Sequence, residues 1–119
     1  MNPKDKVLRI AEACEDRKAQ DVVILDLNGL TLIADYFVIC HGNSDVHMDA
    51  ITDGIREILK EIGDKEDYRV EGNRSQGWIL IDCGDVIAHV FSSDDREYYA
   101  LERLWGDAKE LSADIAASK

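Results

Sequence analysis

The side chains best suited to metal binding or nucleophilic chemistry are the histidines and cysteines, at His41, His47, His89, Cys14, Cys40 and Cys83. His41 and His47 flank a predicted turn, but no paired Cys or Asp stands beside them at the spacing of a metal site. The cysteines are odd in number and scattered through apolar stretches, which is typical of small buried residues in a reducing compartment. The sequence therefore predicts no metal site, no cofactor and no catalytic cysteine.

One short segment could bind an anion. Residues 42–44 (Gly-Asn-Ser) lie at a predicted strand-to-helix turn, where free backbone N–H groups can cradle a phosphate. Nucleotidyltransferase active sites open with such a turn, but they also need paired carboxylates on the following strand to hold Mg²⁺. Here that strand offers residues 67–69 (Asp-Tyr-Arg), with arginine in the second place, while Asp82 and Asp85 belong to a tight turn. We therefore assign no catalytic residue, and a small nucleotidyl-transfer enzyme stays as the alternative function.

The segment from Trp78 to Phe91 is the most informative part of the chain. A two-residue turn at Gly84-Asp85 sets the register of a hairpin in which Trp78 faces Phe91 and Asp82 faces Ile87. Because side chains alternate between the faces of a strand, one face then carries only small or medium apolar residues. That face, predicted to be core, holds Ile79, Ile81, Cys83, Val86, Ala88 and Val90.

The other face of the hairpin mixes aromatic, aliphatic and ionisable side chains. It holds Trp78, Leu80, Asp82, Ile87, His89 and Phe91. Two interpretations stay open. A helix could cover this face, with Asp82 and His89 satisfied by hydrogen bonds. Alternatively, part of it could be an open patch, in which a tryptophan anchors a partner and the neighbouring acid selects it.

The charge of the chain restricts its partners. Lys and Arg total 14 and Asp and Glu total 25, for a net charge of −11. Such a chain repels phosphate, so broad nucleic-acid binding and binding to an anionic membrane are disfavoured. A basic protein partner is favoured. No segment has the order of a signal peptide and no apolar run is long enough to cross a bilayer, which predicts a soluble, cytoplasmic protein.

These side chains must be positioned by a single α/β domain over residues 1–119. Apolar periodicity and capping residues predict helices over 3–18 and 44–62, and a third that begins within 92–95 and runs to about 108. Short β-branched or alternating runs predict the strands, at 22–25, 36–40, 68–71, 78–82 and 86–91. The expected fold is a mixed five-stranded sheet with three helices, and residues 112–119 are expected to be frayed.

Several blocks of the sequence resemble the Iojap-like family of ribosome silencing factors. The match extends over about residues 5–108, and its blocks lie at 35–39 (Asp-Tyr-Phe-Val-Ile), 42–44, 71–72 (Glu-Gly), 78–86, 89–91 and 96–105. The resemblance implies a nucleotidyltransferase-like fold without the catalytic acids. It also implies binding to the large ribosomal subunit through ribosomal protein L-fourteen, which blocks joining of the subunits and lowers translation when nutrients are scarce.

The resemblance also implies a contact surface. Carried over by position, it comprises Trp78, Leu80 and Asp82, with Glu71 and Asp85 at its edge. Supporting roles fall to His89, Arg96 and Tyr99. A homodimer that uses the same aromatic patch stays open as a further interpretation.

Overall fold

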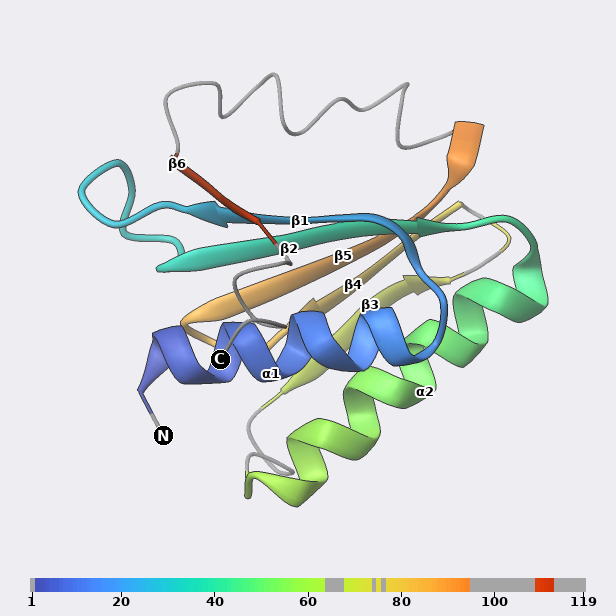
Figure 1. The fold of residues 1–119 in the computed structure, drawn as a ribbon, viewed down its shortest axis with the longest axis horizontal. Coiled ribbons are helices and arrows are strands. Elements are labelled where there is room, and N and C mark those ends of the chain that lie inside the picture. The colour runs from blue at the N-terminus through green and yellow to red at the C-terminus, as the bar shows by residue number, and fades with distance from the viewer. Residues whose placement is uncertain (1, 64–67, 74, 76, 95–108, 113–119) are drawn as a thin grey trace.

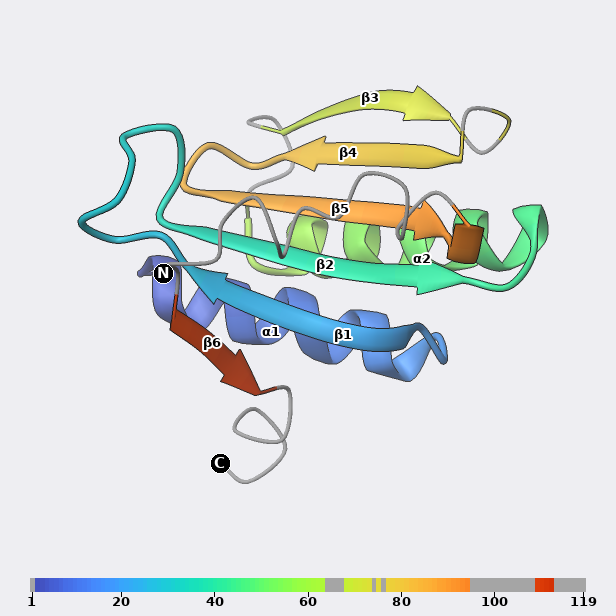
Figure 2. The same cartoon turned by 90° about the horizontal axis from the view of Figure 1, so that it is seen from above.

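The two complete helices of the described chain lie on one face of a mixed β-sheet (Figures 1 and 2). The computed structural model describes residues 2–63, 68–73, 75, 77–94 and 109–112. Its elements in chain order are α1 (Pro3–Asp16), β1 (Gln20–Asp26), β2 (Tyr36–Gly42), α2 (Asp45–Glu61), β3 (Arg69–Asn73), β4 (Trp78–Asp82), β5 (Val86–Ser92) and β6 (Lys109–Ser112).

The strands form one sheet in the order β3-β4-β5-β2-β1-β6. The pairing of β2 with β5 is parallel, and the other four pairings are antiparallel. The predicted single α+β domain with a mixed sheet is confirmed. The five predicted strands are all present, and β6 adds a sixth by pairing with β1. β6 was not predicted from the sequence, because residues 109–112 (Lys-Glu-Leu-Ser) lack both an alternating and a β-branched pattern.

The helix boundaries follow local capping chemistry. Asn2 accepts a hydrogen bond from the backbone N–H of Asp5, and Pro3 occupies the first helical position of α1. This helix ends at Asp16, two residues before the predicted end, because the chain turns through a left-handed residue, Lys18 (φ 63°). In α2, Ser44 caps the N-terminus through a hydrogen bond from His47 N–H.

The predicted third helix can be followed only at its start. Ser93 and Asp94 are helical, and the rest of the predicted helix, up to residue 108, lies outside the described residues. The predicted fraying of 112–119 also lies outside them, apart from Ser112, which belongs to β6.

Both faces of the sheet are apolar, but they pack against different surroundings. On the helix face, α1 and α2 contribute residues such as Val7, Ile10, Ile51 and Ile55, all fully buried. The opposite face, here called the distal face, is a separate cluster. Its buried members are Leu25, Leu27, Ala34, Phe37, Ile39, Ile87 and Phe91, with Trp78 and Leu80 packed against them. Burial on both sides agrees with the lack of polar alternation in β2.

Close approach of the two helices depends on a glycine. A Cβ atom at Gly54 would lie 2.7 Å from Cγ of Arg17, at the end of α1. The Arg17 guanidinium donates to the backbone oxygen of Ala50 at 3.2 Å and pairs with Glu57 at 2.6 Å. Any larger residue at position 54 would displace this arginine.

A buried lysine ties α1 to the β4–β5 turn. Lys6 is only 7% exposed, and its Nζ donates to the backbone oxygen of Cys83 and to Oδ1 of Asp85, both at 2.9 Å. Its burial is tolerated because the ammonium has both a carbonyl and a carboxylate as acceptors.

We expect Lys6→Met to destabilise the fold by about 1–3 kcal/mol, since the methionine keeps the aliphatic packing but removes the donor. The loss should not be larger, because the Asp85 side chain is 34% exposed and water can hydrate it. Urea unfolding measures the difference. The matched control is Lys4→Met at an exposed position of the same helix, which should change stability by less than about 0.5 kcal/mol. Equal losses in the two variants would contradict the structural role of Lys6.

Candidate functional site

The β4–β5 hairpin has the predicted register. Trp78 pairs with Phe91, Leu80 with His89 and Asp82 with Ile87. The turn places Gly84 at its first central position with φ 85°, as a two-residue hairpin turn requires, and Cys83 N–H donates to the Val86 oxygen at 2.9 Å. All six residues predicted to form the core face belong to the cluster under the helices and are at most 5% exposed.

The proposed contact residues share the distal face. Glu71 of β3 pairs with Leu80 of β4, which pairs with His89 of β5, which pairs with Ile39 of β2. Side chains at directly paired positions point to the same side of a sheet, and Trp78 and Asp82 share that side with Leu80 by alternation. The structure therefore brings Glu71, Trp78, Leu80, Asp82 and His89 together.

Burial changes along this row. Glu71 on the edge strand is exposed, Leu80 is half-buried, and His89 is only 4% exposed. The distal face is therefore buried at β5 and β2, half-buried at β4 and exposed at the edge strand β3.

Trp78 is held in place by neighbours on β5. Its indole Nε1 donates to Nδ1 of His89 at 3.1 Å, and its ring stacks on Phe91 with centroids 5.2 Å apart. His89 in turn meets Phe37 edge-on at 4.6 Å. The indole of a half-buried tryptophan is thereby oriented before any partner arrives.

The protonation state of His89 follows from this geometry. Because Nδ1 accepts from Trp78, the neutral ring carries its proton on Nε2. Burial lowers the pKa of His89 to about 4, so the ring is neutral near neutral pH. Within the described part of the chain, Nε2 is buried without a hydrogen-bond partner, so the predicted satisfaction of His89 is only half realised. A ring this weakly basic is suited to packing and to orienting Trp78, and poorly suited to acid–base catalysis.

The remaining predicted contact residues are placed differently. Asp82 accepts from Gly84 N–H at 2.9 Å and lies 3.6 Å from the Arg69 guanidinium, so it also shapes the turn. Asp85 pairs with Lys6, on the side of α1, and is not part of the distal-face row. Arg96 and Tyr99 lie outside the described residues.

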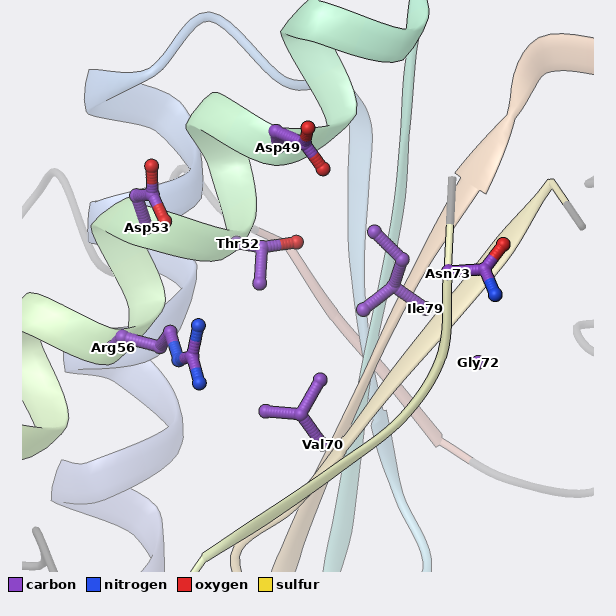
Figure 3. A pocket seen from close by; sticks show the side chains of 8 residues that line it. All are labelled: Asp49, Thr52, Asp53, Arg56, Val70, Gly72, Asn73 and Ile79. Atoms are coloured by element: carbon purple, nitrogen blue, oxygen red, sulfur yellow. The ribbon is translucent and has the colours of Figure 1, made fainter. Parts of the chain in front are cut away.

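A groove of about 440 Å³ lies on the helix side, between α2 and the edge strand β3 (Figure 3). Its walls are Asp49, Thr52, Asp53, Arg56, Val70, Gly72, Asn73 and Ile79. Both carboxylates come from α2, and the β3 and β4 residues of the lining supply none. Among the described residues of its lining, the groove therefore lacks the strand-borne pair that a nucleotidyltransferase uses to hold Mg²⁺. Nowhere in the described ranges do three His, Cys, Asp or Glu residues gather as a metal site would need.

The cysteines are free and buried. A hydrogen bond with the Cys40 thiol, together with burial, raises the pKa of Cys14, which disfavours the reactive thiolate. None of the helices in the described ranges is long and apolar enough to span a membrane.

One exposed apolar surface, in the β1–β2 loop, was not predicted from the sequence. Leu30, Leu32 and Ile33 there are 46%, 105% and 64% exposed. A signal was present, because Asn28-Gly29 predicts a turn and three aliphatic residues follow it within four positions.

We expect the buried His89 to make stability depend on pH. The folded-state pKa, about 4, is below the unfolded value of about 6.5, so the unfolded chain binds the proton more readily between these values. Stability from this group is present above that window and is lost as the pH falls through it, by about 2 kcal/mol between about pH 7 and pH 5. His89→Gln keeps an acceptor for Trp78 but does not titrate. Urea unfolding at both pH values should therefore show a smaller loss in the variant, whereas equal losses would exclude this role of His89.

Comparison with known proteins gives a consistent result over the whole length. A family model described as ribosomal silencing factor during starvation matches residues 1–119. Ribosomal silencing factor RsfS of Bacillus subtilis is 44% identical over 119 residues, which is 100% of both chains. Mitochondrial assembly of ribosomal large subunit protein 1 of the mouse is 29% identical over 89 residues, covering 73% of this chain and 39% of that protein.

A solved structure supports the same relationship. The crystal structure of a protein from Chromobacterium violaceum matches with a TM-score of 0.83 at 34% sequence identity, covering 89% of this chain and 88% of that one. Because the family model and the relatives match along the chain and a solved structure shares its fold, the chain belongs to the ribosomal silencing factor family.

Proposed function

We propose that this protein binds the large ribosomal subunit through ribosomal protein L-fourteen and blocks joining of the small subunit, which represses translation in the cytoplasm. The observation that carries the proposal is the accessible end of the distal-face row, where Glu71, Trp78 and Leu80 lie side by side. The names of the relatives support a ribosomal partner, and that of the mouse protein refers to the large subunit.

The chemistry of this surface suits a basic protein. Trp78 offers a large apolar area whose orientation is already set by His89 and Phe91, so little side-chain entropy is lost on binding. Glu71 and Asp82 place carboxylates beside it, as a polar rim around an aromatic anchor. The net charge of −11 strengthens attraction to a cationic surface at long range.

Silencing then requires no reaction. A bound domain occupies the surface on which the small subunit would dock. Inhibition is therefore by steric exclusion and needs neither a cofactor nor catalysis. In this proposal Asp85 acts mainly by holding the β4–β5 turn to α1. Arg96 and Tyr99 keep the supporting roles that the resemblance implies.

We expect purified protein to shift an association mixture of small and large subunits toward free subunits in a sucrose gradient, and to sediment with the large subunit. The shift should rise with protein concentration and level off at one bound copy per large subunit. Normal joining of subunits in particles saturated with the protein would disprove steric silencing.

We expect Glu71→Lys to weaken binding to large subunits at least about tenfold, because it places a cation against a basic partner. The matched control is Asp53→Lys, which makes the same change in net charge at an exposed position of α2 on the other side of the sheet. The control should stay within about twofold of the parent. Pelleting of the protein with large subunits at several salt concentrations measures both, and the effect of Glu71→Lys should shrink as salt rises. Equal weakening by both variants would mean that only net charge matters and that the distal face is not the contact.

A further inference from the structure

The β1–β2 loop, residues 27–35, carries an unusual group of exposed aliphatic side chains. Among described residues, five large hydrophobic side chains are exposed, and three of them, Leu30, Leu32 and Ile33, lie in this loop. We call these three residues the aliphatic tip. Leu32 contacts so little of the protein that its side chain is fully exposed, at 105%. Such a group adds nothing to the core and carries a solubility cost, which is typical of a binding surface.

The loop that carries the tip is fixed to the domain. Its ends are closed by a hydrogen bond from Leu27 N–H to the Asp35 oxygen at 2.8 Å. Asp26 accepts from both the backbone and the side-chain amide of Asn28, at 2.9 and 2.8 Å. Leu27 is fully buried and Ala34 is 5% exposed, and both pack in the distal-face cluster. The base of the loop is therefore part of the core, and the tip projects into solvent.

The tip lies near one end of the proposed contact surface, the end at which β4 finishes, whereas Trp78 lies at the other end of that strand. The backbone N–H groups of Asp35 and Tyr36 donate to the backbone oxygen of Asp85 at 2.8 and 3.2 Å. These two hydrogen bonds join the loop to the β4–β5 turn. Figure 2 shows the loop beyond the ends of β1 and β2, at the same end of the sheet as that turn. Asp82, the last residue of β4, lies at this end and faces the distal side.

Charge around the tip distinguishes between possible partners. A hollow of about 300 Å³ lies beside the loop. Its walls are Asn28, Asp35 and Tyr36 on one side and the N-terminal residues of α1 with its cap, residues 2–5, on the other. Five carboxylates lie at this end, on Asp5, Asp26, Asp35, Asp82 and Asp85. They outnumber the cations there, which are Lys4, Lys6 paired with Asp85, Arg69 paired with Asp82, and Lys109 opposite Asp26 in the sheet. A second copy of the chain, or an anionic membrane, would bring negative charge against this rim, whereas a basic protein would complement it.

We propose that the aliphatic tip is a second anchor for the same basic ribosomal protein that meets the Trp78 edge of the distal face. This inference rests on the proposed function and extends its contact surface around the end of the sheet. Leu32 and Ile33 insert into an apolar recess of the partner while the surrounding carboxylates meet its cationic rim. Because the loop is already ordered, docking the tip requires little loss of backbone entropy.

The test compares a double variant, Leu32→Ser with Ile33→Ser, with the parent protein in binding to purified large ribosomal subunits. Val46→Ser is the matched control, because Val46 is an aliphatic residue 73% exposed on α2, away from this end of the sheet. We expect about tenfold weaker binding for the double variant and less than twofold for the control. All three proteins should have the same thermal midpoint, since these side chains are exposed. The tenfold ratio should persist at high salt, as an apolar contact requires.

The outcomes separate the inference from the proposed function. If the parent binds large subunits and the double variant binds within twofold of it, the tip is not an anchor and the proposed function stands. If the parent does not bind large subunits, the proposed function fails and this inference fails with it. Light scattering on the free proteins measures their oligomeric state and is a further test. A parent dimer that becomes monomeric in the double variant would assign the tip to a second copy and overturn the proposal.

Discussion

The register of the β4–β5 hairpin decides which of its side chains face the helices and which face the distal side. A two-residue turn leaves only one alignment of the strands, and a slip by one residue would exchange the two faces. In the observed register, six apolar side chains face the helices, and the mixed set around Trp78 faces the distal side. Lys6 reinforces this choice from α1 by binding both the Cys83 oxygen and Asp85. The core and the proposed contact surface are therefore two consequences of one turn.

The distal face combines a packed interior with an accessible edge. At β5 and β2, Phe91, Ile39 and His89 are buried and form a fixed support. At β4 and β3, Trp78 is half-buried and Glu71 is exposed. The single hydrogen bond between the indole and the imidazole links these regions, because it makes a buried neutral histidine determine the orientation of the aromatic anchor. The buried histidine, whose pKa is strongly lowered, thus has a structural role in orienting Trp78.

Two kinds of interaction contribute to the proposed contact, and they act at different distances. The excess of carboxylates attracts a cationic protein before contact and is weakened by salt. The indole of Trp78 and the aliphatic tip act only when the surfaces meet, through removal of apolar area from water. Apolar anchors toward opposite ends of the sheet would also fix the orientation of the bound domain. Orientation matters to a mechanism of steric exclusion, since the volume of the domain must project over the surface that the small subunit needs.

Local features of the chain were predictable because they depend on neighbours in sequence. Asn2 and Ser44 identified the helix starts, and alternation with the Gly84-Asp85 turn identified which hairpin residues share a face. The degree of exposure of each contact residue was not predictable, because it depends on strand order. Glu71 is exposed since β3 forms the edge, and His89 is buried since β5 lies between β4 and β2.

The sequence by itself determined the helix and strand types, the faces of the hairpin and the family, because spacing, capping and turn chemistry act over a few residues. Only the tertiary structure decided that Lys6 would meet Asp85, 79 positions away, that β6 would extend the sheet beside β1, and that the aliphatic tip would lie next to the β4–β5 turn. These three contacts join segments far apart in the chain, and their free energy comes from packing that no local pattern encodes.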